Sequence, residues 1–295
     1  GNNMGLICKI KGHDWEKGLC TRCHARHEMN EHVWKNCACC ICGVSVFDSL
    51  YWARSDQILE SIRRDAVEDS QIQLIDIALR LLTAKDKERR ASGKKAAALV
   101  TDASVLLQRF ATWAQWFDEE KCKEEWNSMS PIVPFDAFSN VDEQAKEQMK
   151  AIIKPHLINI ALNARHMASV RKAMEEVGSL GTLSDEDARR FIPLAENSMY
   201  ALTAIPMLMD CSPIWKTLLT KSCISALGCK LKASNGNSFE KDNASKLLKD
   251  LYSKGCQRDA ISRYNGTVMY DAYNAPTDDD NYGFGSHGII VFRVV

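Results

Sequence analysis

One arrangement of cysteine and histidine occurs twice within residues 8–42, with the second copy nineteen positions after the first. Trp15 and Trp34 repeat at the same offset, each two residues after a histidine. Four thiolate and imidazole donors at such spacing are what a tetrahedral zinc ion requires. The repeat therefore predicts two structural zinc ions. The expected ligands are Cys8, His13, Cys20 and Cys23 in the first copy and His27, His32, Cys39 and Cys42 in the second.

The metal explains how so short a segment folds. With few aliphatic residues, the segment cannot bury enough apolar surface to be stable alone. A structural zinc site contributes about 10–16 kcal/mol of apparent stabilisation. Each C-x2-C turn places two thiolates on one ion, and the two tryptophans are expected to shield the sites from water. The ligand set of the second copy stays open, because Cys37 could replace His27 or His32, and Cys40 is also nearby.

In both copies H-x-W is followed by C-x2-C, and in this respect residues 8–43 resemble the small tandem zinc-ribbon-like units of bacterial proteins. The resemblance implies a metal fold rich in β-hairpins and an adaptor or recognition role. His27 departs from a strict repeat, since the first copy has Cys8 at that position. No resemblance to a known family extends over residues 44–295.

Cysteine usage points to a reducing compartment. Seven of the twelve cysteines and four of the seven histidines lie within residues 8–42, whereas a secreted disulfide scaffold would spread its cysteines without paired histidines. We therefore expect a cytoplasmic protein. No apolar run reaches the length of a bilayer span, so no membrane partner is expected. The 38 basic and 38 acidic residues cancel, which argues against a protein that coats nucleic acid with its whole surface.

The rest of the chain reads mainly as helix, and the predicted fold class is a mainly α, multi-helix bundle domain. Apolar spacing predicts helices over residues 71–82 and 93–119, and a helix from about 141 to 177 that Pro155 kinks. Ser184 followed by acidic residues predicts a helix start. The helix that begins near Pro213 is expected to end at Gly228.

The last thirty residues change character towards strand. Thr267 to Tyr273 alternates, and Gly288 to Val295 is a β-prone run, which together predict a short C-terminal β-hairpin. The expected organisation is a tandem zinc-ribbon-like module over residues 4–46, a helical domain over 47–264 with a subdivision near 128–140, and a hairpin tail over 265–295.

Motifs for catalysis are weak in this sequence. His27 and His32 are five apart, which is not the H-E-x-x-H spacing of zinc proteases. Residues 283–288 match G-x-G-x-x-G by letter, but they precede a strand, whereas the dinucleotide motif follows one. His156 and His166 are interpreted as ordinary helix residues. Because each zinc copy also has four protein ligands and no open position, the sequence favours a protein that is not an enzyme.

Residues 85–95 form the strongest basic run and are interpreted as a solvated turn between helices. The run contains Lys85, Lys87, Arg89, Arg90, Lys94 and Lys95 against Asp86 and Glu88. The favoured hypothesis is a zinc-binding protein that recognises or scaffolds a protein partner. A nucleic-acid-binding protein that uses the zinc module and this basic run is one alternative. An enzyme whose site is assembled from the helical domain is the other.

Overall fold

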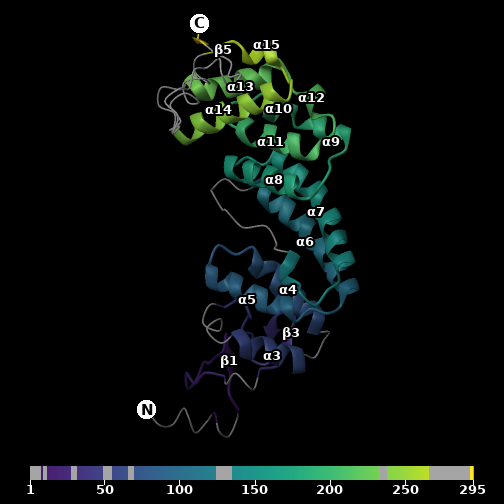
Figure 1. The fold of residues 1–295 in the computed structure, drawn as a ribbon. Helices are drawn as coiled ribbons and strands as arrows, with labels where there is room; N and C mark the ends of the chain where they lie inside the picture. The colour runs from purple at the N-terminus through teal and green to yellow at the C-terminus, as the bar shows by residue number, and fades with distance from the viewer. Residues whose placement is uncertain are drawn as a thin grey trace, which may run out of the picture. The chain divides into compact units, whose positions relative to one another are not determined.

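Helices dominate the chain, and short two-residue strands occur near both ends (Figure 1). The structure is a computed structural model and describes residues 8, 12–27, 32–48, 55–65, 70–123, 135–232, 238–265 and 293–294. The mainly α fold predicted from the sequence is therefore confirmed.

The chain divides into two compact units, which are described separately below. The first comprises Gly1–Lys121 and Trp126–His156, and the second comprises Cys122–Glu125 and Leu157–Val295. The three parts predicted from the sequence were defined in another way, by the metal-ligand pattern and by the expected secondary structure. Their boundaries stay a prediction.

Two β-hairpins open the first unit, one in each copy of the ligand repeat. Their strands are β1 (Trp15–Glu16) with β2 (Leu19–Cys20), and β3 (Trp34–Lys35) with β4 (Ala38–Cys39). Both hairpins are antiparallel, and Trp15 pairs with Cys20 as Trp34 pairs with Cys39. The hairpins place each tryptophan opposite the first cysteine of its C-x2-C turn.

In the first unit α4 is buried along most of its length and packs against α3 and α5. Its closest neighbour is α5, because Gly93 brings the two backbones together: a Cβ at Gly93 would lie 2.8 Å from the backbone nitrogen of Leu82. The elements are α3 (Ser55–Asp65), α4 (Ser70–Leu82), α5 (Lys87–Ala98), α6 (Ala103–Lys123), the 3-10 turn η2 (Phe135–Ala137) and the first part of α7 (Glu143–Asn163).

The single helix predicted over residues 93–119 is wrong, because α5 ends at Ala98 and α6 begins at Ala103. The Gln71 side chain, which comes from α4, accepts hydrogen bonds from the backbone N–H groups of Thr101 and Asp102 at 2.7 and 3.1 Å. The side chain of Asp86 caps the start of α5. The basic run at 85–95 therefore lies mostly in a helix and not in a turn.

The second unit is a cluster of short helices. The predicted helix over 141–177 is wrong as one element: it breaks after Asn163, and His166 caps the next helix by accepting from Ala168 N–H. The predicted start at Ser184 is confirmed, since its hydroxyl accepts from Asp187 N–H. The helices are α8 (Met167–Ser179), α9 (Asp185–Arg190), α10 (Ile192–Ala195), α11 (Ala201–Cys211), α12 (Trp215–Leu218), α13 (Lys221–Lys232), α14 (Ser238–Ser253) and α15 (Arg258–Ile261).

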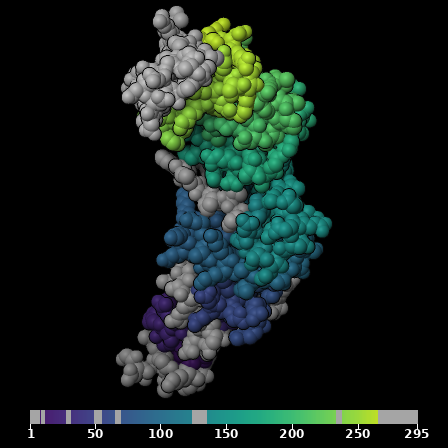
Figure 2. Space-filling model, in the orientation of Figure 1, coloured from purple at the N-terminus to yellow at the C-terminus, as the bar shows by residue number. Residues whose placement is uncertain are grey.

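Gly228 lies inside α13 instead of ending it, which corrects the sequence prediction. The ring of Tyr264 packs directly on this glycine, and a Cβ there would lie 2.0 Å from the ring. Gly228 is thus a site of close approach and not a helix terminator. The neighbouring helices α13 and α14 lie side by side (Figure 1), and Figure 2 shows the surface of this part of the second unit in green to yellow-green.

Tyr264 also begins the strand pair near the C-terminus. Strand β5 (Tyr264–Asn265) runs antiparallel to β6 (Arg293–Val294), which falls within the predicted strand run Gly288–Val295. The other predicted strand, Thr267–Tyr273, lies outside the described residues, as does the glycine-rich stretch 283–288. Within the described helices, none is long and apolar enough to span a bilayer.

Candidate metal centre

The two hairpins bring the eight predicted ligands together in two clusters. In each cluster the four candidate ligand atoms lie within 4.8 Å of one another. The first cluster is Cys8, His13, Cys20 and Cys23, and the second cluster is His27, His32, Cys39 and Cys42. Both memberships match the sequence-derived sets, so the folded chain gathers the side chains that the repeat singled out.

The distances within each cluster fit a tetrahedral zinc ion. With Zn–S bonds of about 2.3 Å and Zn–N bonds of about 2.0 Å, tetrahedral angles place two sulfurs about 3.8 Å apart and a sulfur and a nitrogen about 3.5 Å apart. In the first cluster the Sγ atoms of Cys8 and Cys20 are 3.6 Å apart, and Cys23 Sγ lies 3.3 Å from His13 Nδ1. In the second cluster Cys42 Sγ lies 3.4 Å from His32 Nδ1.

Each cluster contains one cysteine with a lowered pKa and one with a raised pKa. Burial acts to raise the pKa of Cys20, but hydrogen bonds from backbone N–H groups and the histidine ring of its cluster lower the pKa to about 5. Cys39 shows the same balance, with its pKa lowered to about 6. Burial raises the pKa of Cys8 and of Cys42 to about 11, and a neighbouring thiol in each cluster adds to the rise. A divalent cation reverses such a rise, because a coordinated thiol is deprotonated.

The backbone repeats at the same offset of nineteen residues as the ligands. His27 N–H donates to Gly18 O, and Val46 N–H donates to Cys37 O, both at 2.9 Å. The left-handed backbone positions also recur, since Gly18 has φ of +82° and Cys37, its counterpart, has φ of +59°. Left-handed φ angles are strained for residues other than glycine, so the chain adopts the same hairpin twice even where its sequence differs.

Five aromatic rings form a continuous aromatic column through both clusters. Centroid distances between successive rings are 4.6, 4.7, 4.5 and 5.0 Å. The order of the column is His13, Trp15, His27, His32 and Trp34. Each tryptophan stacks on the histidine of its own cluster, as the shielding role predicted from sequence requires. Trp15 additionally contacts a ligand of the second cluster, which the sequence did not indicate.

The second hairpin is fixed to the helices by buried polar contacts. Trp34 Nε1 donates to the hydroxyl of Ser61 on α3 at 3.2 Å. Gln73 of α4 accepts from Cys37 N–H at 3.1 Å and donates to Trp34 O at 3.3 Å. All four of these side chains are buried. Sequence reasoning missed Ser61 and Gln73, because a single serine or glutamine in a helix carries no signal of the surface it will meet.

The additional cysteines near the second cluster are placed apart from it. Cys37 directs its sulfur towards the backbone carbonyl of Gln73, at 3.8 Å, and the Cys40 side chain is exposed. The second cluster is complete with His27 and His32, so the substitution by Cys37 that the sequence left open is not needed to reach four donors.

Some cations of the basic run at 85–95 bind other groups of the chain. Arg90 donates to the carbonyl oxygens of Ala84 and Lys85 in the segment between α4 and α5, and Lys95 pairs with Asp56 at 2.9 Å. Lys85, Lys87 and Lys94 have exposed side chains. The run therefore offers fewer available cations than its sequence suggests.

The helices also bring together acidic and basic groups that the sequence separated. His156 Nδ1 lies 3.0 Å from Asp118 Oδ2, which pairs residues from α7 and α6 within the first unit. Their separation of 38 positions hides the pair from motif searches. Such an arrangement can orient an imidazole, but by itself it supplies neither a nucleophile nor a substrate pocket.

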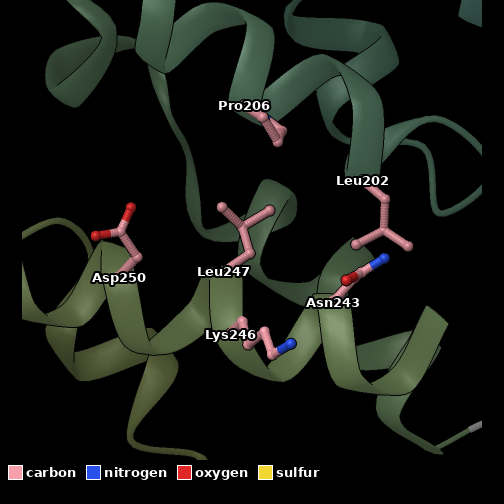
Figure 3. Close-up of a pocket in the computed structure, with 6 residues that line it drawn as sticks. All are labelled: Leu202, Pro206, Asn243, Lys246, Leu247 and Asp250. Carbon is pink, nitrogen blue, oxygen red and sulfur yellow. The ribbon is translucent and has the colours of Figure 1, made fainter. Parts of the chain in front are cut away.

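The second unit has a groove on its surface between two helices. It has a volume of about 330 Å³ and lies between Leu202 and Pro206 of α11 and Leu247 of α14 (Figure 3). Its charged lining residues are Lys246 and Asp250, and Asp250 forms an ion pair with Lys254 at 2.6 Å. This lining is not a convergent set of catalytic groups.

Comparison with known proteins does not add a family. No family model, curated protein or solved structure matches this chain. The zinc-ribbon-like resemblance of residues 8–43 therefore stays a prediction, and the functional argument depends on the geometry of the two clusters.

Proposed function

We propose that this protein binds two structural zinc ions and uses the zinc-stabilised hairpins, together with the adjoining helices, as a non-catalytic surface that recognises or scaffolds another protein. The observation that carries the proposal is the pair of complete four-donor clusters. Cys8, Cys20 and Cys23 with His13 supply a Cys3His set, and the second cluster supplies a Cys2His2 set. Both sets are typical of closed structural sites.

The way the hairpins are held supports a bracing role for the metal. A catalytic zinc ion keeps one coordination position open for water, whereas each cluster offers four protein donors, enough to fill a tetrahedral site. The second hairpin is also built into the helical unit through Trp34, Ser61 and Gln73. Zinc in this cluster would hold a surface in shape.

Capture of a protein partner by variant proteins tests the recognition role. The double variant Cys20→Ser with Cys23→Ser removes two donors of the first cluster. Cys40→Ser is the matched control, because Cys40 is an exposed cysteine outside both clusters. We expect the wild-type protein and Cys40→Ser to retain the same partner, and the double variant to lose it. Unchanged capture by a double variant whose first hairpin has demonstrably lost zinc would reject the proposal.

Nucleic-acid binding stays the alternative, with the exposed side chains of Lys85, Lys87 and Lys94 as its support. Binding of this kind weakens steeply as salt rises, because counterions are released from the phosphates. A titration of DNA and RNA at increasing salt distinguishes the two functions. Binding at low salt that Lys87→Glu and Lys94→Glu abolish would favour the alternative, and no binding at low salt would remove it.

A further inference from the structure

The two clusters differ sharply in how far water can reach their ligands. In the second cluster every ligand is buried, with His27 at 6% exposure and the remaining three ligands at 2%. In the first cluster Cys8 and Cys20 are buried, but His13 is exposed and Cys23 is half-buried. A competing ligand can therefore approach the first cluster from solvent, while the four ligand residues of the second cluster are all buried.

The clusters also differ in what holds their hairpins. The second hairpin is anchored to α3 and α4 through Ser61 and Gln73, and Val44 and Val46 beside it are fully buried. In the described part of the chain, the first hairpin is linked to the second hairpin and its cluster by backbone hydrogen bonds from Gly18 N–H to Cys42 O at 3.3 Å and from His27 N–H to Gly18 O at 2.9 Å, and by the contact of Trp15 with His27. The contacts named here tie the first hairpin to the second hairpin and its cluster, whereas those of the second hairpin tie it to α3, α4 and the core.

We propose that the two sites have different roles: the second holds zinc as a permanent part of the fold, and the first is an exchangeable zinc site that empties and refills with the supply of the metal. This inference rests on the proposed binding of two zinc ions. The exchange is a ligand substitution without electron transfer. Because His13 is the exposed ligand of the first cluster, it would be the first donor that a thiolate or carboxylate of a competing chelator replaces, and the cysteine ligands would be replaced after it.

Emptying the first cluster changes the surface of the hairpins and leaves the helices intact. His13 is stacked on Trp15, which in turn contacts His27 in the second cluster. Loss of the first ion removes the restraint on His13 and Trp15, while Trp34 stays bound to Ser61. Available zinc would thus control the part of the recognition surface that the first hairpin contributes.

Zinc release into an excess of a chromogenic chelator, measured on the full-length protein loaded with two zinc ions, tests this inference. We expect two kinetic phases of equal amplitude, one ion each, with the fast phase at least about tenfold faster, equivalent to ~1.4 kcal/mol in activation free energy. Cys23→Ser should abolish the fast phase and leave the slow one. The fast phase should coincide with a change in tryptophan fluorescence that Trp15→Phe removes.

A pair of glutamines on α4 provides the matched test of the slow phase. Gln73→Met removes the hydrogen bonds that anchor the second hairpin and should accelerate the slow phase about tenfold, without altering the fast phase. Gln71→Met is the control, because Gln71 binds the segment between α5 and α6 instead of a hairpin. It should leave both phases unchanged at temperatures well below unfolding.

The outcomes separate this inference from the proposed function. Release of both ions in a single phase, or a slow phase that Gln73→Met leaves unchanged, would overturn the inference of unequal sites. Purified protein that never binds two zinc ions would instead reject the proposed function on which it rests. Loss of the slow phase in Cys23→Ser would assign the sites the other way round and would also overturn the inference.

Discussion

At the scale of single residues, the hydrogen bond between Trp34 and Ser61 fixes the second hairpin to α3. Trp34 is fully buried, so its indole N–H has no access to water and depends on the serine hydroxyl. A buried donor without an acceptor is costly, because it loses its hydrogen bond to water on folding and gains none in return. Ser61 is consequently important to the hairpin although its side chain is small.

Ser61→Ala should destabilise the zinc-loaded protein by about 1–3 kcal/mol, the cost of a buried polar group left unsatisfied. Chemical denaturation monitored by circular dichroism measures the change. Ser104→Ala is a suitable control, since Ser104 is exposed on a helix and its replacement should shift stability by no more than ~0.5 kcal/mol. Equal stability of the two variants would show that the Trp34 N–H does not need this acceptor.

At the scale of secondary-structure elements, the packing of α4 against α5 depends on Gly93. The α4 and α5 backbones approach too closely at this point for any side chain, because an added Cβ meets backbone atoms of Leu81 and Leu82, which have no room to move. The helix therefore tolerates the intrinsic cost of an internal glycine in exchange for this packing.

Gly93→Ala should destabilise the protein by about 1–3 kcal/mol, because overpacking forces the helices apart. Gly178→Ala tests the opposite case in a helix of the second unit. There the atoms nearest to an added Cβ all belong to Met207, the nearest at 3.5 Å, which is an ordinary contact, so alanine should be neutral or stabilising by up to ~1 kcal/mol. Thermal melting of both variants measures the difference, and shifts of the same sign would contradict this account.

Secondary structure was predictable where a signal lies within the element itself. The helix at 71–82 and the cap at Ser184 follow from apolar spacing and from an oxygen that accepts from local N–H groups. The break between α5 and α6 was not predictable, because Gln71, which binds Thr101 and Asp102, lies on another helix. The prediction that Gly228 ends a helix was wrong for a similar reason, because Tyr264, which packs on this glycine, is distant in the sequence.

At the scale of the whole molecule, the two units differ in their relation to the metal sites. Both clusters lie in the first unit, within which the second hairpin is bound to α3 and α4. The eight cluster residues were predictable because their spacing repeats in the sequence, whereas the anchoring residues Ser61 and Gln73 appeared only in the folded structure. The bound metal should therefore stabilise the first unit selectively.

Removal of zinc by a strong chelator should increase amide hydrogen exchange in both hairpins and in α3 and α4, because any ligand that binds only the folded state stabilises it. Protection in α11 and α13 of the second unit should not change. Hydrogen exchange with mass spectrometry resolves these segments, and added zinc, but not magnesium, should restore protection. An increase spread evenly over all helices, or none at all, would contradict the selective role.

Metal content and coordination of protein that is saturated with zinc and then freed of unbound metal test the central claim most directly. We predict two zinc ions per chain. X-ray absorption should show a total of five sulfur and three imidazole nitrogen ligands for the two ions together, from Cys8, Cys20, Cys23, Cys39, Cys42, His13, His27 and His32. Bond lengths should be about 2.3 Å to sulfur and about 2.0 Å to nitrogen. Protein without tightly bound transition metal, or zinc with a water oxygen among its four ligands, would contradict the account.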